Sequence, residues 1–394
     1  MNSSGKIYTL KSWDEGESRF TIDYAQALNG QQLAAVTAPE GPALVIAGAG
    51  SGKTRTLVYR VAYLIEKGVP AETILLLTFT RKAAQEMLLR VGELIGGASE
   101  QVLGGTFHAV ANLLLRRHGR SVGLEPGFTI LDRGDAEDLI NLLRAEAGLS
   151  GKEKRFPRKG TIADIFSKSE NTCQELEHIV FEEFPHFAEQ IPDLQRLKNA
   201  YDRTKLDRQL VDYDDLLVKL RDLLHTDAGV AQVITQRFQW ILVDEYQDTN
   251  RLQAQLIRAL AGTRGNLMAV GDDSQSIYGF RGATFRNIME FPTLFPGTII
   301  FKLEENFRST QPILNLANQI IEAAPEKYSK RLFTRQLDGP LPALVEAPGE
   351  HAQSRFVAQR ILELHEEGVA LGEIAVLFRS SFHAFDLEIE LSRR

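Results

Sequence analysis

Short apolar runs of strand-forming residues alternate with helical patterns through much of this 394-residue chain. Four of the runs, at residues 43–47, 74–79, 240–243 and 266–270, predict buried strands. Strands that alternate with helices along a chain are typical of a parallel sheet covered by helices. The pattern therefore predicts an α/β fold.

A long stretch at residues 115–212 interrupts the alternation, because it is charged, helix-like and free of clear strand patterns. We interpret it as a helical insertion in a loop of the first α/β domain. The insertion contains a basic segment at residues 151–160, GKEKRFPRKG, which predicts a loop.

The alternation resumes after residue 283 and predicts the start of a second α/β domain. Its strand patterns lie at residues 298–303, 341–346 and 374–378, and its helical patterns lie at residues 311–324 and 354–367. These strands are too few to close a core, so the sequence looks truncated. We expect four parts: an N-terminal extension (1–24), a first domain (25–114 and 213–283), the helical insertion (115–212) and a partial second domain (284–394).

Composition excludes several classes of protein. The net charge of −7 gives no support to nucleic-acid binding through bulk charge, so such binding would need a local groove. The one cysteine, Cys173, excludes an intrachain disulfide and a cysteine-rich zinc site. No apolar run approaches the roughly 20 residues of a membrane span, and the polar N-terminus lacks a signal peptide's apolar core. We expect a cytoplasmic protein that does not contact a membrane.

The segment AGAGSGKT at residues 47–54 has the sequence and surroundings of a phosphate-binding P-loop. It follows a strand pattern and precedes a helical one, so backbone N–H groups and the positive end of the helix can face an anion. Lys53 can reach the β- and γ-phosphates, and the Thr54 hydroxyl can hold Mg²⁺. A glycine-rich turn without a ligand is the alternative. The predicted nucleotide contacts are Ala47, Gly48, Ala49, Gly50, Ser51, Gly52, Lys53 and Thr54.

Two adjacent carboxylates, Asp244 and Glu245, end the strand pattern at residues 240–243. The carboxyl ends of strands form the ligand-binding edge of an open α/β sheet. Asp244 is suited to hold Mg²⁺, and Glu245 is suited to orient and deprotonate an attacking water. An exposed acidic turn is the alternative, which the P-loop in the same chain disfavours.

Several motifs together resemble the UvrD/Rep/PcrA family of superfamily 1 DNA helicases, which translocate 3′ to 5′. They are TFTRKAAQEM at 78–87, GTFH at 105–108, DEYQDTN at 244–250, VGDDSQSIYGFRGA at 270–283 and NFRS at 306–309. The motifs come in the family's order, and the resemblance runs from about Leu28 to the last residue. It implies a RecA-like P-loop ATPase domain with a helical insertion, followed by part of a second RecA-like domain.

For the nucleotide site, the resemblance implies ATP and Mg²⁺ as cofactors and an adenine pocket. Gln32 matches the glutamine that recognises adenine, and its neighbour Gln31 is the weaker candidate. Arg55 matches an arginine near the nucleotide. Phe307 stands where the family usually has tyrosine and can still stack on adenine.

For catalysis, the resemblance implies four residues: Lys53, Glu245, Gln275 and Arg308. Lys53 and Glu245 take the roles already derived from the residues. Gln275 matches a glutamine that senses the γ-phosphate, and Arg308 matches an arginine finger that stabilises charge in the transition state. Thr54 and Asp244 would hold the metal.

The resemblance also implies single-stranded DNA and single-strand/double-strand junctions as partners. The matching DNA-contact positions are Thr78, Phe79, Thr106, His108, Tyr278, Phe280 and Arg281. Aromatic side chains stack on bases of any sequence, so Phe280, where the family commonly has tryptophan, should still provide a platform. Without the family match, a residue such as Phe79 is more often part of the core, and a histidine such as His108 more often has its hydrogen bonds made within the protein than to DNA.

Two further segments leave alternatives open. Asp214 and Asp215, in DYDDLL, form either a charge pair at a helix start or a functional site. The basic residues at 152–159 contact duplex DNA or form a solvated surface, the second being more common.

The function implied is ATP-driven translocation on single-stranded DNA with duplex unwinding. We find neither of the family's later motifs, so we expect this chain to be an N-terminal fragment with an incomplete motor and no helicase activity. Two alternatives remain: a helicase–nuclease subunit with the same motor motifs, and a nucleotide-regulated DNA-binding module that does not unwind.

Overall fold

The computed structural model describes residues 20–149, 156–279 and 282–393. The chain divides into two compact units, Met1–Leu337 and Asp338–Arg394. The predicted N-terminal extension lies almost entirely outside the described residues. Within these residues, we find no helix with the length and apolar character needed to cross a membrane.

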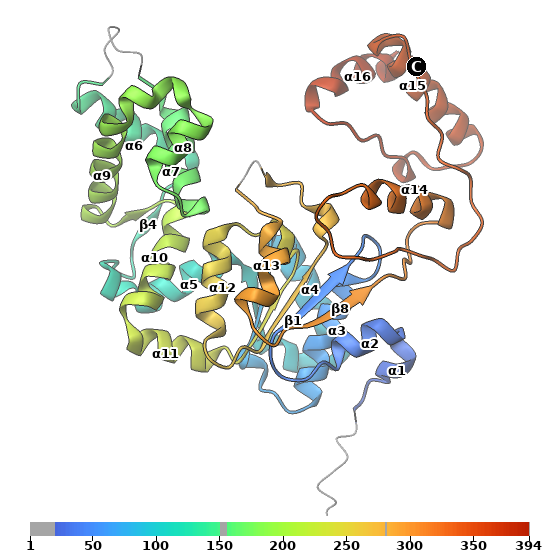
Figure 1. Cartoon of the computed structure of the whole chain (residues 1–394), viewed down its shortest axis with the longest axis horizontal. Coiled ribbons are helices and arrows are strands. Elements are labelled where there is room, and N and C mark those ends of the chain that lie inside the picture. Colours follow the sequence, from blue (N-terminus) through green and yellow to red (C-terminus); the bar gives the residue numbers. More distant parts are fainter. Residues whose placement is uncertain (1–19, 150–155, 280–281, 394) are drawn as a thin grey trace, which may run out of the picture. The chain divides into compact units, whose positions relative to one another are not determined.

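The first unit is built on a six-stranded parallel sheet with the strand order β3-β2-β6-β7-β1-β8 (Figure 1). The strands are β1 (Ala43–Ala47), β2 (Ile74–Thr78), β3 (Leu103–Thr106), β6 (Trp240–Val243), β7 (Leu267–Gly271) and β8 (Ile299–Leu303). The sheet confirms the α/β class, and the four runs assigned to the first domain form strands within one residue of their predicted ends. Strand β3 was not predicted, because its sequence LGGT is short and half glycine.

Strand β8 lies in the first sheet, where it pairs with β1 from Ala43↔Ile299 to Ala47↔Leu303. The sequence analysis placed this strand in a second domain, whereas its backbone pairs with a strand of the first. Sequence position misleads here because parallel pairing joins strands that are far apart in the chain. The other proposed domain boundaries remain a prediction.

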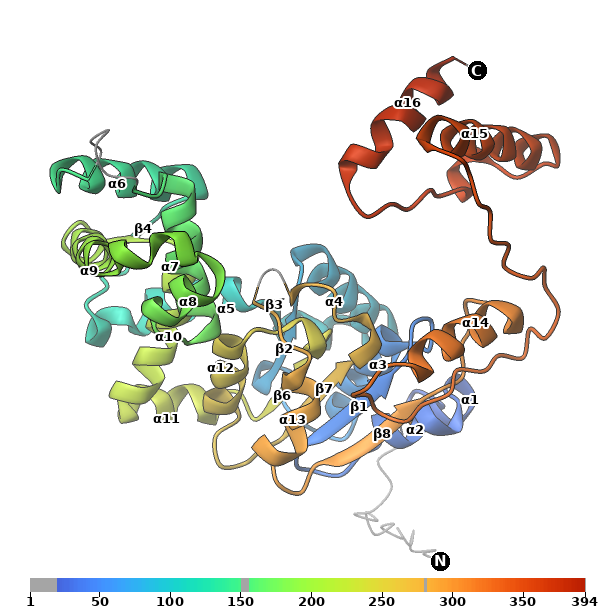
Figure 2. The same cartoon turned by 45° about the horizontal axis from the view of Figure 1, so that its top comes forward.

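Helices cover both faces of the sheet, since alternate residues of each strand point to opposite sides. One core joins Leu44, Leu75 and Ile241 to helices α5, α10, α12 and α13, and the other joins Val45, Leu76 and α2, α3 and α4. Outside the insertion, the α-helices of the first unit are α1 (Tyr24–Ala27), α2 (Gly30–Val36), α3 (Lys53–Glu66), α4 (Arg81–Ile95), α5 (Phe107–His118), α10 (Tyr213–Thr226), α11 (Ala228–Arg237), α12 (Arg251–Ala261), α13 (Arg286–Leu294) and α14 (Gln311–Glu322). Figure 2 shows α14 beyond the carboxyl ends of β1 and β8.

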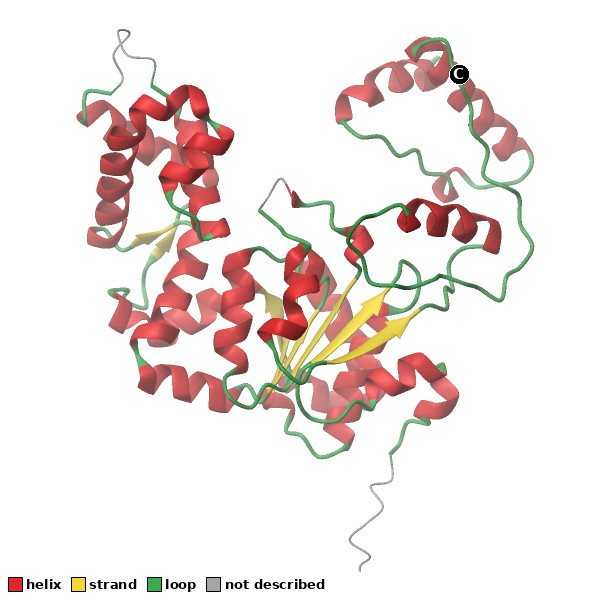
Figure 3. Cartoon of the chain, in the orientation of Figure 1, coloured by secondary structure: helices red, strands yellow, loops and turns green. Residues whose placement is uncertain are grey.

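The insertion is helical, as predicted, and has its own core around Ile140, Phe166 and Leu194. Its helices are α6 (Arg133–Glu146), α7 (Lys159–Thr172), α8 (Leu176–Glu183) and α9 (Ile191–Asp207). It is not free of strands, because β4 (Thr129–Ile130) and β5 (Leu210–Val211) pair in parallel where the chain enters and leaves it (Figure 3). Two-residue strands have no periodicity that a sequence pattern could reveal.

The second unit contains two α-helices among its described residues, α15 (Glu350–Glu366) and α16 (Ala384–Ser392), which pack on each other. The strands predicted at 341–346 and 374–378 are wrong, since those described residues are not in strands. Their apolar side chains are largely exposed, with Leu344 at 89% and Leu377 at 92%. A strand needs a hydrogen-bonding neighbour, which an apolar run by itself does not provide.

Candidate active site

The P-loop connects the end of β1 at Ala47 to the start of α3 at Lys53. Gly50 and Gly52 have φ of 72° and 87°, a left-handed conformation that glycine adopts without steric penalty. A Cβ on Gly50 would come 2.6 Å from Asn306 Nδ2, and one on Gly52 would come 2.6 Å from Gln32 Nε2. Both glycines therefore suit the backbone conformation, and Gly50 is also closely approached by the Arg308 Cβ, 2.8 Å from where a Cβ would lie.

Lys53 and Glu245, separated by 192 residues, form an ion pair with 2.6 Å between Nζ and Oε2. Gln247 Nε2 donates to the same oxygen at 2.8 Å. Glu245 has φ of 50°, an uncommon conformation for a residue with a side chain. The fold thus brings together the two residues that the sequence assigned to phosphate binding and to water activation.

Asp244 is buried at the end of β6, and its Oδ1 has no hydrogen-bond partner among the residues that the structure describes. Burial and the adjacent Glu245 charge raise the pKa of Asp244 to about 7, although Lys53 opposes the shift. A buried carboxylate in this state either takes up a proton or binds a cation. Mg²⁺ is a hard cation that prefers oxygen ligands, so Asp244 Oδ1 has the chemistry of a metal ligand, and the Thr54 hydroxyl as a second ligand stays a prediction.

A pocket of about 670 Å³ opens beside the P-loop and is lined by Gln32, Arg55 and Phe307. Gln32 is buried, donates from Nε2 to the Ser51 carbonyl at 3.0 Å and accepts from the Asn29 backbone. Gln31 instead bonds to Glu304 and does not line the pocket. The structure thus groups the predicted adenine-contacting residues, although their contacts with a nucleotide remain predictions.

The NFRS segment is hydrogen-bonded to the P-loop. Asn306 Nδ2 donates to the Ala49 carbonyl at 2.5 Å, and the Phe307 backbone N–H donates to the Gly50 carbonyl at 2.9 Å. Asn306 also accepts from the Arg308 backbone, which holds Arg308 beside Gly50. Sequence reasoning missed Asn306, although it lies within a motif that had been recognised.

Gln275 lies on the turn that follows β7, where its Nε2 donates to Asp272 Oδ2 at 2.6 Å. The Asp272 backbone N–H donates to Gln247 Oε1 at 2.9 Å. Gln247 therefore contacts both Glu245 and the turn that carries Gln275. It was also missed, and its place within DEYQDTN was the available signal.

Those predicted DNA-contact residues that the structure describes include several around the ends of β2 and β3. The rings of Phe79 and Tyr278 meet at 5.2 Å between centroids. His108 packs against Tyr213 at 5.9 Å, and burial lowers the pKa of His108. Phe79 and His108 line a single cleft of about 550 Å³.

Other predicted DNA contacts have structural partners or are not described. Thr78 is buried and donates to the Thr80 carbonyl at 2.8 Å, while Thr106 caps α5 by accepting from Ala109 N–H at 3.3 Å. Phe280 and Arg281 lie outside the described residues. Contact of these side chains with DNA therefore stays a prediction.

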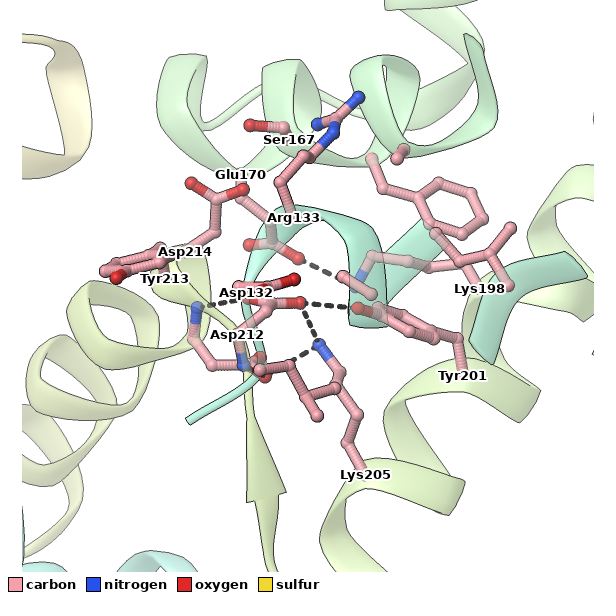
Figure 4. Close-up of a pocket in the computed structure, with 16 residues that line it drawn as sticks. Asp132, Arg133, Ser167, Glu170, Lys198, Tyr201, Lys205, Asp212, Tyr213 and Asp214 are labelled. Carbon is pink, nitrogen blue, oxygen red and sulfur yellow. Dashed lines mark hydrogen bonds and ion pairs between the residues drawn. The ribbon is translucent and has the colours of Figure 1, made fainter. Parts of the chain in front are cut away.

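The DYDDLL segment starts α10 and lines a small pocket (Figure 4). Asp212 and Asp215 form a capping box, each accepting from the other's backbone N–H. Buried Lys205 lies 2.7 Å from both carboxylates, and Tyr201 donates to Asp212 at 2.9 Å. Asp215 therefore has the helix-start role that the sequence left open.

Asp214 has a different role, because it accepts from Asn171 Nδ2 at 2.8 Å. Asn250 is the last residue of DEYQDTN, and its Nδ2 donates to Asn171 Oδ1 at 2.6 Å. These contacts connect α7 of the insertion to the start of α12. In the basic loop, residues 150–155 are not described, and Lys159 is paired with Asp138 at 2.5 Å.

A P-loop between a parallel strand and a helix, with carboxylates ending another strand of the same sheet, defines a P-loop nucleotide-binding protein. The family model described as UvrD/REP helicase N-terminal domain matches residues 28–296, and that of the UvrD-like helicase C-terminal domain matches residues 301–394. The chain belongs to the UvrD/REP helicase family.

Individual relatives agree with this assignment. DNA helicase II of Escherichia coli (strain K12) is 40% identical over 364 residues, which cover 92% of this chain and 49% of the relative. ATP-dependent DNA helicase PcrA of Staphylococcus epidermidis (strain ATCC 35984) is 36% identical over 363 residues with the same two coverages. The chain spans about half the length of the curated relatives it matches.

Proposed function

We propose that the full-length protein is an ATP-dependent DNA helicase that translocates 3′ to 5′ on single-stranded DNA. Its cofactors would be ATP and Mg²⁺, and its partners single-stranded DNA and single-strand/double-strand junctions. The observation that carries the proposal is the 2.6 Å pair of Lys53 and Glu245, with Asp244 adjacent. Family membership supports the helicase class.

On nucleotide binding, Lys53 would exchange Glu245 for the β- and γ-phosphates, which carry more negative charge. Glu245, released from the ion pair but still held by Gln247, would orient and deprotonate the attacking water. Thr54 and Asp244 would hold Mg²⁺, which neutralises charge developing on the phosphates. Arg308, held beside the P-loop by Asn306, would stabilise the same charge.

Hydrolysis would couple to DNA through the turn after β7. Gln275 lies on this turn, and Tyr278 follows three residues later with its ring against Phe79. A change in the Gln275 position would therefore move an aromatic base-stacking residue. Translocation requires that the affinity for the DNA strand differ between the two nucleotide states, and such a movement would change that affinity.

The test is to measure ATP hydrolysis by the full-length protein with and without single-stranded DNA, and unwinding of duplexes with 3′ or 5′ tails. We expect DNA-stimulated hydrolysis and preferential unwinding from 3′ tails. Lys53→Ala should abolish hydrolysis, whereas Lys67→Ala, exposed near the end of the same helix, should not.

Two results would contradict the proposal. Near-normal ATP hydrolysis in Lys53→Ala would show that the P-loop lysine does not take part in the reaction. DNA binding without stimulated hydrolysis or unwinding in the wild-type protein would instead indicate a nucleotide-regulated DNA-binding module.

A further inference from the structure

Lys330 is a buried cation on the segment that follows α14. Its side chain is 1% exposed and bonds to Asp272 and Asp273, whose side chains are 4% and 2% exposed. The ammonium group therefore lies between two carboxylates, which offset the cost of burying its charge. No sequence motif singled out Lys330.

Asp272 accepts hydrogen bonds from Lys330 and from two residues of the turn that follows β7. Its Oδ1 accepts from Lys330 and from the Ser274 backbone N–H at 3.0 Å, and its Oδ2 accepts from Gln275 Nε2 at 2.6 Å. Asp272 Oδ2 accepts this bond, so the NH₂ end of the Gln275 amide faces Asp272. The second N–H and the carbonyl oxygen of Gln275 then remain for other partners.

The same contacts continue to the P-loop. Asp272 N–H donates to Gln247 Oε1 at 2.9 Å, Gln247 Nε2 donates to Glu245 at 2.8 Å, and Glu245 pairs with Lys53 at 2.6 Å. A continuous set of hydrogen bonds therefore joins Lys330 to Lys53.

The segment that carries Lys330 is itself anchored at several points. Tyr328 donates from its backbone to Asp273 at 3.0 Å and from its hydroxyl to the Ile288 carbonyl at 3.1 Å. Two residues after Lys330, the Leu332 side chain lies against Gly48 of the P-loop, where a Cβ would come 2.3 Å from Leu332 Cδ2. Lys330 is thus held at a defined position relative to the site.

We propose that Lys330 is a positioning residue for ATP hydrolysis, which acts through Asp272 to orient the Gln275 amide. The inference rests on the proposed function and adds to it a residue from outside the recognised motifs. Lys330 does not contact the reacting atoms. It holds the Asp272 carboxylate in place through Oδ1, and Asp272 Oδ2 fixes which end of the Gln275 amide faces the γ-phosphate.

The test compares Lys330→Met with wild type in the full-length protein, measuring kcat and KM for ATP with saturating single-stranded DNA, and binding of fluorescent mant-ADP. We expect kcat to fall about 10- to 100-fold, as is typical when a supporting residue behind an active-site group is removed. Mant-ADP affinity should stay within about threefold, because ADP has no γ-phosphate for Gln275 to sense.

Lys330→Met also leaves two buried carboxylates without a cation, so a loss of stability must be separated from a loss of positioning. The double variant Lys330→Met/Asp273→Asn removes one charge of each sign and should recover most of the melting temperature. It leaves Asp272 without its cation, so kcat should stay low. Lys327→Met is the matched control, since Lys327 donates to the Ile321 and Glu322 carbonyls at the end of α14 and should keep wild-type kcat.

Recovery of kcat together with the melting temperature in the double variant would overturn the inference, because Lys330 would then be purely structural. An unchanged kcat in Lys330→Met would also overturn it. Absence of DNA-stimulated hydrolysis in the wild-type protein is a separate result, which would overturn the proposed function first.

Discussion

Glu245 combines a strained backbone with a paired carboxylate at the centre of the site. Its φ of 50° is a conformation that raises the energy of a non-glycine residue by about 1–3 kcal/mol. The surrounding contacts to Lys53 and Gln247 hold the residue in place. Such strain is commonest where a side chain must point in one direction for function.

Glu245→Gln should keep ATP binding and lower hydrolysis, because glutamine has the same shape but cannot accept the proton of the attacking water. Loss of a general base typically lowers the rate by about 10²–10⁴-fold. Single-turnover hydrolysis and mant-ATP binding in the full-length protein would measure the two effects. Glu40→Gln, on the surface, is the control. A parallel loss of binding and hydrolysis would indicate a structural role for Glu245.

Helices α9 and α10 are joined by the buried charges around Lys205, shown in Figure 4. Asp215 and Asp212 raise the pKa of Lys205 even though burial opposes the shift. Lys205 therefore stays charged across the physiological pH range, and its partners close the capping box that begins α10. Lys205 thus bonds to both carboxylates that cap the start of α10.

Lys205→Met should lower the free energy of unfolding by about 3–5 kcal/mol, since breaking a buried ion pair leaves uncompensated charge. Chemical denaturation monitored by circular dichroism would measure the change. Lys159→Met removes an ion pair whose partners are both exposed, and it should have little effect. Equal stabilities of the two variants would show that the Lys205 cluster does not stabilise the insertion.

The chain carries a net charge of −7, so the proposed DNA binding must depend on local surfaces. The described cleft that contains Phe79 and His108 is lined mainly by polar and aromatic side chains. Stacking on aromatic rings tolerates any base sequence, and phosphate contacts make binding depend on salt. The proposed track should therefore show little sequence preference.

Phe79→Ala should weaken single-stranded DNA binding by about 1–3 kcal/mol, by a similar amount for different sequences. The slope of affinity against salt should not change, because a ring makes no phosphate contact. Fluorescence anisotropy with labelled oligonucleotides at several salt concentrations would measure both quantities. Leu89→Ala, an exposed apolar residue of α4, is the control. If Phe79→Ala bound single-stranded DNA with wild-type affinity, the DNA would have to bind at another surface.

Features with a local signature were predictable from the sequence. The P-loop, the carboxylates after β6 and the four runs that became β1, β2, β6 and β7 each occupy a few adjacent residues. A strand between helices has a hydrophobic pattern, and a phosphate loop has glycines at fixed spacing, so both can be read without knowing the neighbours. The motifs also indicated the family that the comparisons show.

Contacts between distant segments were decided only by the tertiary structure. Pairing of β8 with β1, attachment of Asn306 to the P-loop and burial of Lys330 against Asp272 each join residues 58 or more positions apart. The apolar runs at 341–346 and 374–378 had strand patterns but are not strands among the described residues. A pattern sets what a segment can become, whereas hydrogen-bonding partners and burial set what it becomes, and these depend on the packed chain.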